Sequence, residues 1–412
     1  MGIRLHTEYG KVNITAFLEY LLMALVVLYS SMWCLFVESQ SNFFLRLAYP
    51  VLLVLIVLKV RVVSYGRLQR LILLAAALAV YLLGTRYNVA RYGLYFVGPL
   101  LLLMLYIGMK DNEGDPFGLL YKLGDIVTVL TVISLVCFVF GTCLDVLPFK
   151  DTVSYYFAGY DRTCTTYFHL YYAAQTMLMF GHELVRNCGM FAEAPGFAMF
   201  LVIALATEVF FRVRPRLWRC GVIAAAALTT FSTKAILLVM LVVGIKVVID
   251  RPRRIEWQRL KVLVLPLGGL VLLGAAAVLL IDKMNTASFF IRLDDLAASF
   301  KAFASSPLFG TGYYNDDSII ALFAYDRSNN GLSMGLAVLL AQGGLFLTAV
   351  YLVPMYLCIR RFCSGDRLRV AAFFLVYIGL LFVSNMPFSF LSLFLLAFSM
   401  EAGQSELSHH IT

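Results

Sequence analysis

The stretch "RNCGMFAEAPGFAMFLVIALA", from Arg186 to Ala206, joins a short charged segment to a long apolar run. Glu193 is the only acid in this stretch, and Pro195 suits the first turn of a helix. Intramembrane acids are rare and mostly face a bundle interior or a wet cavity. The stretch therefore predicts a membrane helix over residues 194–213 with charged residues at its mouth.

Similar apolar runs recur along all 412 residues, of which 61% are hydrophobic and only 14% charged. This composition excludes a soluble domain and predicts an all-α polytopic membrane protein, with residues 1–412 forming one integral membrane domain. Asn385-Met386 alone separates the last two runs, which can also be interpreted as one broken helix. The expected spans, about 12 in number, are 14–36, 44–60, 69–85, 90–109, 125–147, 194–213, 217–232, 235–250, 260–281, 332–357, 370–384 and 387–401.

The net charge of +9 has a topological explanation. If the N-terminus lies inside, most of the 33 lysines and arginines fall in inside loops and at inside span ends. We therefore expect both termini in the cytoplasm, no nucleic-acid partner and no cleavable signal peptide. No P-loop, H-E-x-x-H motif or His/Asp cluster occurs, so we expect no cofactor and no metal.

Two long loops interrupt the rhythm of the spans, and both lie outside on this topology: residues 148–193 and 282–332. Loops of this length are usually functional, and we expect short amphipathic helices in them. The first loop is rich in aromatic residues, which suit the membrane interface, and its Cys164 and Cys188 are candidates for a disulfide.

The second loop predicts one amphipathic helix, because its apolar residues recur at three- and four-residue spacing. The helix should end before Pro307, and Gly310 and Gly312 mark a tight turn after it. The residues of the apolar stripe are Phe289, Leu293, Leu296, Phe300 and Phe303.

Four charged residues beside these outer segments each have a plain structural interpretation. Arg186 and Lys234 can extend toward lipid headgroups, Arg292 can be solvated, and Glu193 can form an ion pair or sit in the first turn of a helix. If the fold brings them together, they instead form an anion-binding pocket at the outer leaflet.

Four motifs in this order resemble the polymerase branch of the bacterial O-antigen ligase/polymerase superfamily. They are "RNCGMFAEAP" (186–195), "FSTKAILLVML" (231–241), Arg292 with its helix and "SPLFGTG" (306–312), and "SMGLAVLLAQGGLF" (333–346). Two positions depart from the family pattern. Lys234 stands where an arginine is commoner, and Ser333 stands where ligases carry a histidine.

The resemblance implies a GT-C-like membrane glycosyltransferase of the bacterial cytoplasmic membrane, acting in O-antigen, capsule or exopolysaccharide synthesis. It would polymerise oligosaccharide repeat units carried on undecaprenyl pyrophosphate at the outer face, with a flippase and a chain-length regulator as protein partners. Arg186 and Arg292 would stabilise the departing pyrophosphate, and Glu193 would orient Arg186 or act as a base. The implied substrate-binding residues are Lys234, Arg327, Tyr313 and Ser333.

Three other classes remain open from the sequence. A ligase that transfers finished glycan to another acceptor shares the fold and the chemistry, and only the missing histidine argues against it. A flippase for lipid-linked oligosaccharide would favour two similar halves and short outer loops, and neither is present in this sequence. A scaffold without chemistry would not require long, ordered, charged loops.

Overall fold

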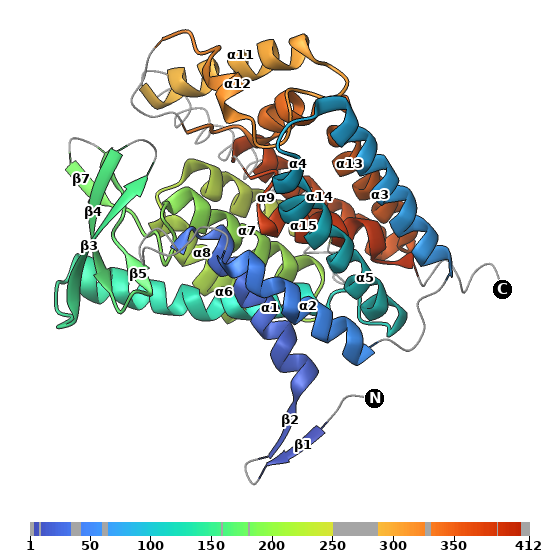
Figure 1. Cartoon of the computed structure of the whole chain (residues 1–412). Coiled ribbons are helices and arrows are strands. Elements are labelled where there is room, and N and C mark those ends of the chain that lie inside the picture. The colour runs from blue at the N-terminus through green and yellow to red at the C-terminus, as the bar shows by residue number, and fades with distance from the viewer. Residues whose placement is uncertain are drawn as a thin grey trace.

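The computed structural model describes residues 4–7, 10–33, 43–59, 65–157, 160–179, 182–249, 287–325, 331–384 and 386–404. The described chain is mostly helical (Figure 1). Its helices are α1 (Ile14–Ser30), α2 (Phe43–Lys59), α3 (Tyr65–Thr85), α4 (Val89–Tyr92), η2 (Gly93–Val97), α5 (Gly98–Asn112), α6 (Gly118–Val136), η3 (Cys137–Cys143), α7 (Ala194–Phe210), α8 (Leu217–Thr229), α9 (Thr233–Ile249), α11 (Ala287–Ser305), α12 (Asp316–Ile320), α13 (Gly335–Arg361), α14 (Ser364–Val383) and α15 (Phe390–Glu401).

The long helices have the length and composition of membrane spans. Four are long and apolar enough to cross a bilayer: Tyr65–Thr85, Val89–Asn112, Gly118–Cys143 and Gly335–Arg361. Shorter apolar helices accompany them, including α1, α7, α8 and α15. Each predicted span coincides with a helix except 260–281, which lies outside the described residues, and the last two spans form separate helices.

The chain is mostly helical as expected, but the first long loop contains β-structure, so the expectation of short amphipathic helices in this loop was wrong. Strands β3 (Lys150–Phe157), β4 (Tyr160–Tyr167) and β5 (Tyr171–Tyr172) form an antiparallel sheet, and β6 (Thr176–Met179) pairs with β7 (His182–Val185). Tyrosine, threonine and phenylalanine favour strands, and this local preference was missed when the aromatic residues were assigned to the interface.

Two smaller features concern the start of the chain and the cysteines of the first long loop. A further hairpin, β1 (Arg4–Thr7) with β2 (Gly10–Asn13), precedes α1. Cys164 and Cys188, the candidates for a disulfide, are both buried free thiols.

Helix α7 forms the centre of the bundle. Pro195 lies in its first turn, and all its residues except Pro195 and Gly196 are buried. It packs against α6, α8, α9 and α14 (Figure 1). Because α7 is apolar around its whole circumference, its position is fixed by burial on every side.

Helix α11, the predicted amphipathic helix, packs on α13 with its small and polar face. Ala298, Ser299 and Ala302 are buried there, whereas Leu293 and Phe300 of the apolar stripe are exposed. The other stripe residues, Phe289, Leu296 and Phe303, are half-buried, so the expected stripe is not the face that packs on the bundle.

The turn after α11 is inserted into a break in α13. Gly344 has φ +60°, and the backbone of residues 307–312 forms hydrogen bonds across the break: Thr311 N–H to Ala341 O (2.8 Å) and Leu345 N–H to Pro307 O (2.9 Å). The contact is close, because a Cβ on Gly344 would lie 2.4 Å from Leu308 O. The two glycine motifs of the sequence thus form one joint, which fixes α11 relative to the bundle.

We expect Gly344→Ala to lower the stability of the folded protein by roughly 2–4 kcal/mol, because the side chain meets both backbone strain and backbone atoms. The measurement is thermal unfolding in detergent. Gly124→Ala is the matched control, since no atom lies within 4 Å of its added Cβ, and it should be neutral or slightly stabilising. Equal stability of both variants would contradict the role of the joint.

Candidate functional site

Charged side chains gather at the two ends of α7. Glu193 occupies the N-cap position, and Glu208 lies in the last turn. The 17 residues of the helix give a rise of about 25 Å. The two charged regions are therefore separated by most of the thickness of a bilayer core.

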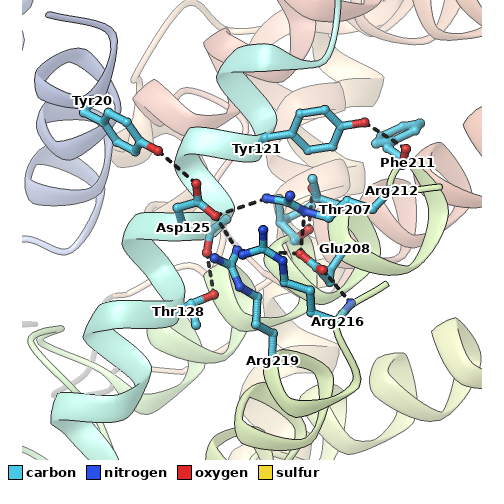
Figure 2. A network of polar contacts seen from close by, with 12 residues as sticks. Tyr20, Tyr121, Asp125, Thr128, Thr207, Glu208, Phe211, Arg212, Arg216 and Arg219 are labelled. Carbon is cyan, nitrogen blue, oxygen red and sulfur yellow. Dashed lines mark hydrogen bonds and ion pairs between the residues drawn. The ribbon is translucent and has the colours of Figure 1, made fainter. Parts of the chain in front are cut away.

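At the Glu208 end the acids are paired with cations (Figure 2). Asp125 of α6 accepts hydrogen bonds from Arg212 Nη2 (3.1 Å), from Arg219 Nη1 and from Tyr20 Oη (2.9 Å). Glu208 Oε2 lies 2.7 Å from Arg212 Nε. Such compensation is what a structural ion-pair network requires, so we do not place the chemistry here.

Other buried ion pairs lie at the corresponding helix ends. Glu19 near the start of α1 is 2.9 Å from Lys122 Nζ, and Glu401 at the end of α15 is 3.3 Å from Arg67 Nε. Both carboxylates are buried. The first pair joins the starts of α1 and α6, and the second joins the end of α15 to the start of α3, as expected where these helix ends share one side of a membrane.

Arg186 lies at the opposite end and is held by its neighbours. Its Nε donates to Thr230 O (2.9 Å), and its Nη1 donates to Gln175 Oε1 (3.3 Å). Gln175 Oε1 also accepts from Ala194 N–H (3.1 Å), which ties Arg186 to the first turn of α7. Among the described residues, Nη2 of Arg186 has no hydrogen-bond partner, so it is available for a ligand.

The next residue fixes this turn to the helices. Asn187 Nδ2 donates to Thr229 Oγ1 (2.9 Å) and Ser134 Oγ (3.2 Å), and its Oδ1 accepts from Gly189 N–H (3.0 Å). Gly189 has φ +55°, a backbone conformation that favours glycine. "RNCG" is therefore a turn built to hold Arg186 against the connection between α8 and α9.

Among the described residues, Glu193 differs from the acids at the other end of α7 because it is not paired with a cation. Within the described part of the chain, its carboxylate forms no hydrogen bond and has no ion pair within 4 Å, including with Arg186. Burial raises the pKa of Glu193, and the positive charges of Lys234, Arg162 and Arg186 partly oppose that rise. Gln175 and Thr230, not Glu193, hold the Arg186 guanidinium.

Two further cations approach from other elements. Lys234 in the first turn of α9 donates from Nζ to Ser384 Oγ (2.7 Å), just beyond the end of α14. Burial lowers the pKa of Arg186, and the charge of Arg292 on α11 lowers it further. Arg292 is therefore electrostatically coupled to Arg186 although it is distant in sequence.

The sequence-predicted residues Arg186, Glu193, Lys234 and Arg292 thus share one charged region. Arg162 on β4, which the sequence reasoning missed, acts on Glu193 in the same region. The sequence signal for it was a cation inside an otherwise aromatic loop. Gln175 and Asn187 gave no recognisable signal, because neutral amides are common in loops.

The remaining predicted residues lie elsewhere. Tyr313 is 1% exposed and packs against Tyr92, Phe96 and Phe388, which gives it a packing role. Ser333 donates from Oγ to Asp295 Oδ2 (2.5 Å) and so connects α11 to the start of α13. Arg327 lies outside the described residues.

No protein-family model, curated protein or solved structure matches this chain.

The two charged ends of α7 should face opposite sides of the membrane. We expect Asp161→Cys, at an exposed position of β4, to react with a membrane-impermeant maleimide in intact spheroplasts of a cysteine-free background. Arg214→Cys, exposed beyond the other end of α7, should react only after permeabilisation. Labelling of both positions in intact spheroplasts would overturn this arrangement.

Proposed function

We propose that this chain is a glycosyltransferase that polymerises undecaprenyl-pyrophosphate-linked oligosaccharide repeat units at the outer face of a bacterial cytoplasmic membrane. The observation that carries the proposal is the gathering of Lys234, Arg162 and Arg186 around an acid without an ion pair among the described residues, Glu193, with Arg292 acting on Arg186. About 12 spans in a GT-C-like arrangement, with both termini inside, belong to the same proposal.

The cations supply what a diphosphate leaving group needs. The acceptor hydroxyl oxygen bonds to the anomeric carbon of the donor sugar, while the bond from that carbon to the pyrophosphate oxygen breaks. The electron pair leaves on the pyrophosphate, where fixed guanidinium groups stabilise the added charge. Arg186 suits this task because two hydrogen bonds hold it and Nη2 remains available.

Glu193 suits the role of general base. The hydroxyl must lose its proton as the new bond forms, and a carboxylate with a raised pKa accepts a proton more readily than an ordinary one. Because Arg186 is held by Thr230 and Gln175, Glu193 is not needed as its brace. We therefore assign the base role to Glu193.

Helix α11 suits a lipid-linked substrate. Besides burial, the positive charge of Arg292 lowers the pKa of Arg186. Phe290, Leu293 and Phe300 are exposed on another side of the same helix. Large exposed apolar side chains beside a membrane protein's spans can contact lipid. One helix thus offers a cation for the diphosphate and an apolar face for the polyprenyl chain.

The central test uses Arg186→Ala and Arg292→Ala with purified protein and synthetic lipid-linked repeat units. We expect each to lower the polymerisation rate roughly 100- to 1,000-fold, as when one charge-stabilising donor is lost. The control is Arg360→Ala, which removes an exposed arginine in the last turn of α13, away from the proposed site. This variant should retain activity.

The products of this assay also separate the rival functions. Normal polymer from both arginine variants would contradict the assignment of the site. Transfer of finished glycan to another acceptor would indicate a ligase, and transport across vesicles without new glycosidic bonds would indicate a flippase.

The pH dependence tests Glu193. A base must be ionised, so activity should fall as the pH drops through the pKa of Glu193, at a pH above the usual 4.5 because burial raises that pKa. Glu193→Gln should remove this acid limb and lower the rate about 100-fold or more, while binding of the lipid-linked donor persists. An unchanged pH profile in Glu193→Gln would exclude the base role.

A further inference from the structure

A groove with a volume of about 640 Å³ opens on the outer side of the helix bundle. Helix α6 forms its floor, and α1 and α8, which both pack against α6, contribute its walls. Tyr20, Asp125 and Arg219 line one part, and apolar side chains such as Val129, Val132 and Ile133 line the rest.

The apolar part of this groove faces the bilayer. Val129 is 59% exposed and Val132 is 42% exposed, and α6 belongs to the span Gly118–Cys143. The lining runs along α6 from Asp125 to Ile133, which corresponds to about 12 Å of helical rise. One leaflet of the hydrocarbon core is about 15 Å thick, so the groove matches the depth reached by one acyl chain.

The segment between α7 and α8, which leads into the polar end of the groove at Trp218 and Arg219, carries more positive than negative charge. Arg212 and Arg219 are offset by Asp125 and Glu208 (Figure 2). Arg214 and Arg216 follow α7 directly, are exposed, and have side chains without ion pairs among the described residues.

An aromatic residue marks the rim of the groove. Trp218 is 57% exposed there, and tryptophan favours the level of the headgroups. An apolar channel with an interfacial tryptophan at its rim, and with the exposed Arg216 two residues before that tryptophan, has the polarity of a single lipid molecule.

We propose that this groove binds one anionic phospholipid of the leaflet at the Glu208 end of α7. One acyl chain lies along α6 between α1 and α8, and the headgroup phosphate lies against Arg216 and Arg214. Such a lipid site holds the α6–α8 contact together from outside. It is separated from the proposed catalytic region by the length of α7 and does not depend on the proposed reaction.

The test is native mass spectrometry of the purified full-length chain in detergent with phosphatidylglycerol or phosphatidylcholine added at equal concentration. We expect one phosphatidylglycerol molecule to be retained, at least five-fold more than phosphatidylcholine. Val129→Trp, which fills the groove, and the double variant Arg214→Gln with Arg216→Gln should each reduce retention at least five-fold.

Matched controls alter the same properties elsewhere. Leu375→Trp enlarges an exposed residue on α14, and Arg360→Gln with Arg369→Gln removes the same charge near the connection between α13 and α14. Both should retain phosphatidylglycerol as the unaltered chain does. Equal retention of the two lipids, or equal loss in test and control variants, would overturn the proposal.

Discussion

The low dielectric of a bilayer dictates where charge can lie in this chain, and α7 shows this most clearly. Between Glu193 and Glu208 the helix carries no charged side chain and is almost wholly buried. An isolated charge placed within it would cost several kcal/mol or shift to its neutral form. The charges of the neighbouring segments are therefore confined to two regions at opposite ends of the helix.

The two regions differ in how their charges are balanced. At the Glu208 end, each acid named above has a cation within 4 Å, so the region can be understood as structural. At the Glu193 end, the carboxylate shares its surroundings with several cations but forms no ion pair with them among the described residues. Holding a half-buried carboxylate in this state is unfavourable without a ligand or a reaction to compensate, which is why we place the chemistry there.

The sequence predicted the helices well because apolar runs of bilayer length are a strong, local signal. It failed for residues 150–185, where strand propensity and interfacial preference draw on the same aromatic residues. The association of Arg186 with Arg292 could be expected only from the family resemblance, because it depends on tertiary packing. Gln175, which holds Arg186, could not be found at all, since one amide in a loop has no pattern.

The joint at Gly344 explains how a helix outside the bundle can contribute to the site. An exposed helix joined by flexible loops would place Arg292 over a wide volume, and transition-state stabilisation requires fixed groups. The backbone hydrogen bonds between residues 307–312 and the break in α13 restrict the movement of α11 at one end. Asp295, which accepts from Ser333, holds the middle of α11 as well, one turn from Arg292. The packing of α11 through small residues follows from the same need, because only a close approach lets both anchors form.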